Sequence, residues 1–143
     1  MTQTFRLAGL LRLRQLEQDE AAGDLAAANA RVAETAHRQA KARTDLETTG
    51  SEPTSPETLA AIAASRAAAR MLLADLETLE RTRRESAEQA QAAFSTARAR
   101  SIGLEKLEAK HTVREAAADL RAEQLFLDEL TSSARHAARG AGR

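Results

Sequence analysis

Both prolines of this 143-residue chain fall in one short segment, and that clustering limits the possible folds more than any other feature. The segment runs from Thr48 to Pro56 and is also rich in hydroxyl residues. Because proline interrupts helices, one such segment in a chain that is otherwise free of proline predicts two long helices and a single turn. We expect one coiled-coil domain over residues 1–143, with a helix over about 4–49, a turn over 50–55 and a helix over about 56–138.

The turn segment also carries signals for where each helix stops and starts. Gly50 can adopt the left-handed conformation that closes a helix. Ser55 is placed to cap the second helix, with Pro56 at the first helical position, where its missing N–H costs nothing.

The composition supports an all-helical chain. Aromatic residues make up 2% of the sequence, with 3 Phe and no Tyr or Trp, whereas charged residues make up 29%. Few bulky side chains are available for a sheet or for the core of a round enzyme domain. We therefore predict an all-α fold: a long antiparallel two-helix coiled-coil hairpin with an overhanging C-terminal helix.

Apolar residues recur with the seven-residue period of a coiled coil in both predicted helices. In the first helix, one seam position holds Leu11, Gln18, Leu25, Val32, Gln39 and Leu46. The other seam position holds Leu7, Ala21, Ala28 and Ala42. In the second helix, one position holds Ile62, Ala69, Leu76, Arg83, Ala90, Ala97, Leu104, His111, Ala118 and Leu125. A companion position three residues later holds Leu72, Leu79, Ser86, Ala93, Arg100 and Leu107. Beyond residue 110 the better stripe is Val113, Ala117, Leu120, Leu127 and Leu130.

The two predicted helices differ in length, so part of the second has no partner in the hairpin. With the turn centred on Pro53, Leu7 lies near Ala99, and residues 102–138 extend past the first helix. Apolar residues on this overhang mark an interaction surface. Three arrangements could cover it: a fold-back near Gly103, pairing with a second copy, or insertion into another protein. A short separate helix over residues 57–70 would instead let the first helix pair further along the second.

The residues that carry catalytic chemistry give no pattern of an enzyme. The chain has no Cys, and its three His lack the spacing of a zinc site. Phosphate-binding glycine motifs are missing from the sequence. We expect no catalytic residues, no metal and no cofactor.

Charge and hydropathy limit the surfaces to which the chain can bind. The 21 Lys+Arg balance the 21 Asp+Glu, which disfavours nucleic acid as a partner. No apolar run is long enough to span a membrane, and arginines interrupt the apolar N-terminus, unlike in a signal peptide. We expect a cytoplasmic protein with at most peripheral membrane association.

Motifs near both termini resemble the FliJ family of flagellar export proteins. The N-terminal motif is Phe5-x-Leu7-x-x-Leu10-Leu11-x-Leu13-Arg14, followed by Glu17, Ala21-Ala22 and Leu25. The C-terminal motifs are Leu104-Glu105-Lys106-Leu107-Glu108 and Leu127-Asp128-Glu129.

This resemblance implies a non-enzymatic component of the flagellar type III export apparatus, located at the inner face of the membrane. A member of the family is expected to bind the hexameric export ATPase (FliI-like) as a central stalk and to promote its assembly and activity. Contacts with the export gate protein (FlhA-like) and with export chaperones are also implied. The matching ATPase-binding residues are Leu7, Leu10, Leu13, Glu17, Leu107, Glu108, Leu127, Asp128 and Glu129.

The resemblance places the export-gate contact near the turn. The matching residues are Ala42, Asp45, Thr49, Ala69, Leu72 and Leu76. The family's aromatic residues on that face are replaced here by Asp45, Thr49 and small residues. The alternative function is a generic coiled-coil tether or self-assembling scaffold, in which the overhang pairs with a second copy.

Overall fold

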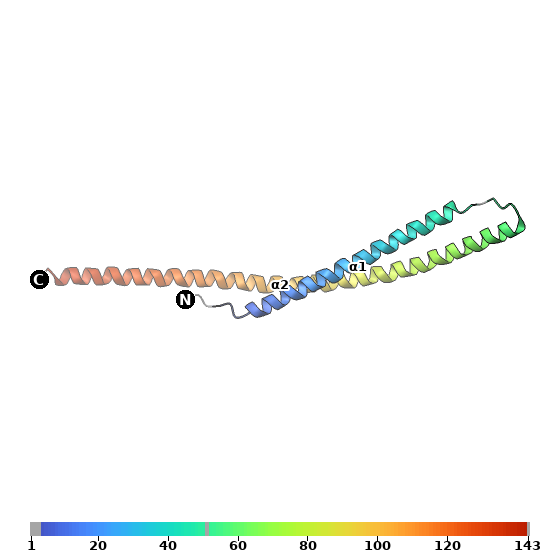
Figure 1. Cartoon of the computed structure of the whole chain (residues 1–143). Helices are drawn as coiled ribbons and strands as arrows, with labels where there is room; N and C mark the ends of the chain where they lie inside the picture. Colours follow the sequence, from blue (N-terminus) through green and yellow to red (C-terminus); the bar gives the residue numbers. More distant parts are fainter. Residues whose placement is uncertain (1–3, 51, 143) are drawn as a thin grey trace. The chain divides into compact units, whose positions relative to one another are not determined.

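The computed structural model of the chain describes residues 4–50 and 52–142. Two α-helices are present there, α1 (Ala8–Thr48) and α2 (Pro56–Gly140), and they pack against each other (Figure 1). The described residues include no strand. The predicted all-α helical hairpin is therefore confirmed. The single-domain organisation stays a prediction, and Ser51 of the predicted turn lies outside the described residues.

Contacts within the chain group it into two units. The terminal unit contains residues 1–15 and 99–143, and the turn unit contains residues 16–98. In each unit a stretch of α1 packs against a stretch of α2, so each has its own seam and can be described separately.

Hydroxyl side chains close α1 and open α2. Thr48 Oγ1 donates a hydrogen bond to Thr44 O at 2.9 Å, and Thr49 Oγ1 donates to Asp45 O at 2.8 Å, so side chains satisfy carbonyls of the last turn. Ser55 Oγ accepts a hydrogen bond from Thr58 N at 3.2 Å, which confirms the predicted cap. The left-handed conformation expected at Gly50 is not found, because no described residue has a positive φ. The hydroxyls of Thr48 and Thr49 close the last turn of α1, in place of the left-handed conformation predicted at Gly50.

The α1 seam follows the predicted heptads. Leu11, Ala28, Gln39 and Ala42 are buried, and the remaining predicted seam residues are half-buried except Leu7, which is 38% exposed. Thr35, which was not assigned to the seam, is fully buried on the same stripe. The seam is thin, because alanine buries little apolar area in each layer.

The α2 seam confirms one predicted position and corrects the other. Residues at the first position are buried or half-buried from Ile62 to His111, but those expected three residues later are exposed except Leu79. The companion position instead lies four residues later and holds Arg66, Leu73, Glu80, Ala87, Phe94, Ser101 and Glu115, all buried or half-buried. Gln39 explains the choice: its buried amide needs a polar partner, and Glu80 on this line supplies one.

The pairing register also differs from the prediction. In the terminal unit, Leu7 lines a groove with Leu107, where Ala99 was expected to be its neighbour, and Gln15 Nε2 lies 3.5 Å from Glu105 Oε1. The connection is not a tight turn centred on Pro53, so α1 pairs further along α2. This shift needs no separate helix over residues 57–70, because α2 is continuous from Pro56.

The corrected register shortens the overhang. Ser101 is fully buried, and Ile102, Leu104 and His111 are half-buried, so the predicted start of the overhang at residue 102 is wrong. Every residue from 116 to 142 is exposed, and we call this range the exposed C-terminal segment. Helix α2 continues through Gly103, which excludes the fold-back into a third helix.

Candidate partner-binding surfaces

The predicted ATPase-binding residues lie mainly in the terminal unit, and most of them are exposed. On α1 the exposed fractions are 38% for Leu7, 37% for Leu10 and 49% for Leu13. Glu17 is half-buried, belongs to the turn unit and has an interaction partner within the chain. The remaining predicted residues, all exposed on α2, are Leu107, Glu108, Leu127, Asp128 and Glu129.

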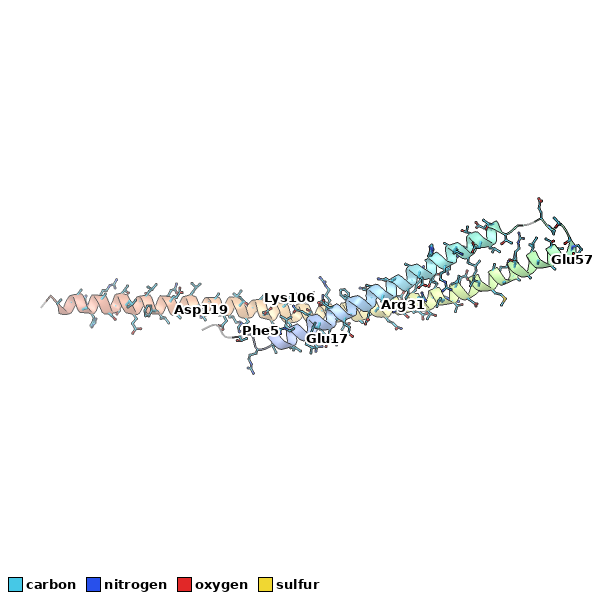
Figure 2. The ribbon with its side chains drawn as sticks, viewed as in Figure 1. Phe5, Glu17, Arg31, Glu57, Lys106 and Asp119 are labelled. Carbon is cyan, nitrogen blue, oxygen red and sulfur yellow. The ribbon has the colours of Figure 1, made fainter. Side chains whose placement is uncertain are left out.

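The exposed C-terminal segment continues an apolar stripe that begins at Val113. Val113, Leu120, Leu127 and Leu130 are 69%, 61%, 58% and 51% exposed. Their spacing of seven and three residues places them on one side of α2. Figure 2 shows side chains projecting on both sides of the ribbon in this part of α2, around Asp119. An uncovered stripe of large apolar residues is typical of a surface that binds another protein.

A second surface of the terminal unit was not predicted as a group. The ring of Phe5 packs edge-on against His111, with 5.6 Å between the ring centroids. Beside this contact lies a groove of about 460 Å³, which we call the basic groove. Its lining residues are Thr4, Phe5, Arg6, Leu7, Leu107, Lys110, His111 and Arg114. The pair Lys110 and Arg114, four residues apart on a helix, is the sequence signal that could have revealed it.

In the turn unit, the structure brings together four of the six predicted gate-binding residues. They line a shallow groove of about 190 Å³ together with Arg38 and Lys41: Ala42, Asp45, Leu72 and Leu76. Ala42 and Leu76 are 7% and 3% exposed, so their main contacts are within the seam. Asp45 and Leu72 are exposed, and Asp45 pairs with Lys41 at 3.3 Å. Thr49 and Ala69 are half-buried.

A polar layer interrupts the apolar seam in the middle of the turn unit. Gln39 Nε2 donates a hydrogen bond to Glu80 Oε2 at 3.1 Å, and Arg84 pairs with the same carboxylate. Arg83 Nη1 donates to the carbonyl of Arg31 at 2.9 Å and reaches Glu34 Oε2 at 3.1 Å. The contacts of Gln39 with Glu80, and of Arg83 with Arg31 and Glu34, join α1 and α2 in one alignment, since sliding the helices by a heptad would break all three.

The polar layer makes the stability of the hairpin depend on pH. The hydrogen bond from Gln39, followed by the pairing with Arg84, holds the pKa of Glu80 below its ordinary value. A carboxyl group with a lowered pKa stabilises the folded state above its unfolded pKa, and this contribution is lost as pH falls through the folded pKa. Glu80→Gln should therefore lower the melting temperature at neutral pH, and its difference from the unchanged chain should shrink below about pH 4.

Circular dichroism melts at several pH values measure this difference, with exposed Glu77→Gln as the matched control. A difference that stays constant between neutral pH and about pH 3 would contradict the role given to Glu80.

Neither a metal site nor a membrane span is found in the described part of the chain. Residues 4–50 and 52–142 contain no group of three or more His, Cys, Asp or Glu side chains that could hold an ion. Within the same ranges, neither helix has an apolar stretch of the length that crossing a bilayer requires.

Comparison with known proteins identifies the family. The family model described as "Flagellar FliJ protein" matches residues 3–140, nearly the whole chain. No curated protein and no solved structure gives a significant match. The match confirms the resemblance seen in the terminal motifs, and the family is a non-catalytic component of flagellar protein export. The chain therefore belongs to the FliJ family and is a component of flagellar export.

Proposed function

We propose that the chain binds the hexameric flagellar export ATPase as a central stalk and promotes its assembly and activity. The observation that supports this most directly is the stripe of Val113, Leu120, Leu127 and Leu130, which α1 leaves uncovered. A single helix is narrow enough, at about 10–12 Å across with its side chains, to enter the centre of a ring of subunits.

Such a stalk needs no chemistry of its own. A protein that binds the assembled ring more tightly than separate subunits shifts the population toward the ring, by an amount set by the difference in affinity. The exposed leucines of the terminal unit supply the contacts, and the predicted acidic residues Glu108, Asp128 and Glu129 lie exposed beside them.

The proposal includes a second contact in the turn unit, with the export gate protein. Leu72, at 47% exposed, and Asp45 are the predicted residues there that a partner can reach. Buried Ala42 and Leu76 would act by holding the helices in place. Export chaperones are the third class of partner, and the site of action is the cytoplasmic face of the membrane.

The ATPase contact is tested by measuring turnover and hexamer formation of the cognate ATPase with and without the chain. We expect the chain to raise both, and Leu127→Asp to weaken the effect at least about tenfold, because it places a charge in an apolar contact. Ala122→Asp is the matched control, since it adds the same charge at an exposed position on another side of the helix.

Neither substitution should alter the helix content, because both positions are exposed. If the chain changes neither turnover nor hexamer formation, or if the two variants act alike, the stalk proposal is wrong.

A further inference from the structure

The basic groove has a charged counterpart further along the same helix. Arg6, Lys110 and Arg114 surround the apolar side chains of Phe5, Leu7 and Leu107 in the groove. In the exposed C-terminal segment, Leu125 is 70% exposed and lies next to the carboxylates of Asp128 and Glu129. We call these three residues the acidic ridge.

The groove and the ridge share one side of α2. At about 100° per residue, Leu107, Lys110 and Arg114 point in nearly the same direction as Leu125 and Asp128. The ridge cannot reach the groove of its own chain, because α2 is continuous between them and about 27 Å separate residues 110 and 128 at 1.5 Å per residue. A ridge that fills the groove must come from another molecule.

We propose that the free protein forms a two-fold symmetric dimer in which the acidic ridge of each copy docks in the basic groove of the other. With the two α2 helices antiparallel and Ala118 opposite the second copy's Arg121, Lys110 lies opposite Glu129. The same alignment places His111 opposite Asp128 and Arg114 opposite Leu125. One two-fold operation therefore forms both ridge-to-groove contacts at once.

Charge complementarity favours a second copy as the occupant. The terminal unit contains both a cationic groove with an apolar floor and an anionic ridge with the apolar side chain of Leu125, and an antiparallel pair of α2 helices places each ridge opposite the other copy's groove. The pairing also covers Leu107 and Leu125, which are otherwise exposed.

This inference goes beyond the proposed function and does not depend on it, although Leu7, Leu107, Asp128 and Glu129 belong to both surfaces, so a chain that binds the ATPase through them is not at the same time a dimer. The stripe of Val113, Leu120 and Leu127 lies on roughly the opposite side of α2 from the ridge. The dimer is measured with the chain alone, whereas the stalk is measured with the ATPase. The dimer proposal can therefore be refuted while the stalk proposal stands, and the stalk proposal can be refuted while the dimer stands.

Charge reversal tests the alignment. Sedimentation equilibrium of the full chain should show a dimer with a dissociation constant on the order of micromolar, weakening as salt rises, as expected for pairing between charged groups. Lys110→Glu with Arg114→Glu should raise the dissociation constant at least about tenfold, and so should Asp128→Lys with Glu129→Lys.

The decisive measurement mixes these two variants. In a dimer of one variant with the other, the reversed groove meets the reversed ridge, and the unchanged groove meets the unchanged ridge. The dissociation constant of the mixture should therefore return to nearly that of the unchanged chain. A single chain carrying all four substitutions should likewise dimerise. The matched control, Asp119→Lys with Glu123→Lys, makes the same charge change on the opposite side of α2 and should leave the dimer intact.

Three outcomes would overturn the dimer. The unchanged chain could be a monomer at about 100 μM, which would leave the groove to an acidic helix of another protein. The paired reversals could have no more effect than the control. The mixture could remain monomeric although both variants keep their helical circular dichroism spectra.

Discussion

Leu76→Ala should lower the free energy of unfolding of the hairpin by about 2–4 kcal/mol. Leu76 is 3% exposed and is the largest buried apolar side chain among the described residues of the turn unit, where many of its neighbours in the seam are alanine. Removing it leaves a cavity that small neighbours cannot refill without moving the helices together. Urea unfolding followed by circular dichroism measures the loss.

Leu72→Ala is the matched control for this substitution. Leu72 lies one turn earlier on α2 and lines the same shallow groove, but it is 47% exposed. Its truncation should change the free energy of unfolding by no more than about 1 kcal/mol, and any effect on export-gate binding should come from lost contact. Equal destabilisation by the two variants would show that the assignment of the α2 seam is wrong.

Leu11→Asp should detach the N-terminal part of α1 from α2. Leu11 is 5% exposed and is the main buried apolar side chain in the part of the terminal unit that the structure describes. An unpaired carboxylate costs about 3–5 kcal/mol when it is buried, more than this short contact supplies, so residues 8–15 should separate from α2. Hydrogen exchange should show these amides losing nearly all protection, while the turn unit keeps its own.

The control for Leu11→Asp is Leu13→Asp, two residues away. Leu13 is 49% exposed, so its replacement leaves the charge in water and should preserve the protection of residues 8–15. If both variants expose the segment equally, helix propensity rather than the buried contact determines its stability.

The helices and the start of α2 were predictable from the sequence, because they depend on local interactions. Two prolines in one segment fix the position of the connection, and Ser55 followed by Pro56 is a local cap. Helix α1 begins at Ala8, after a segment in which the Phe5 carbonyl accepts a hydrogen bond from Ala8 N at 3.1 Å. The exposure of Leu120, Leu125, Leu127 and Leu130 also followed, because the second predicted helix is longer than the first.

The register and the second α2 seam position were not predictable, because both depend on contacts between helices. Leucine frequency favoured the line of Leu72 and Leu79, but the buried amide of Gln39 requires Glu80 on the neighbouring line. In an alanine-rich seam several alignments bury similar apolar area, so a few polar contacts decide among them. The basic charge of the groove could have been predicted from Lys110 and Arg114, but its apolar floor could not, because it depends on the packing of Phe5 against His111.

The exposure of every residue from 116 to 142 has a practical consequence. In most proteins, a systematic survey of substitutions confuses loss of a binding contact with loss of folding, because one side chain serves both. Here the two effects separate: changes in this stretch leave the hairpin intact, apart from those to proline or glycine. Any phenotype from such a survey in swimming cells would report directly on what the bare helix touches.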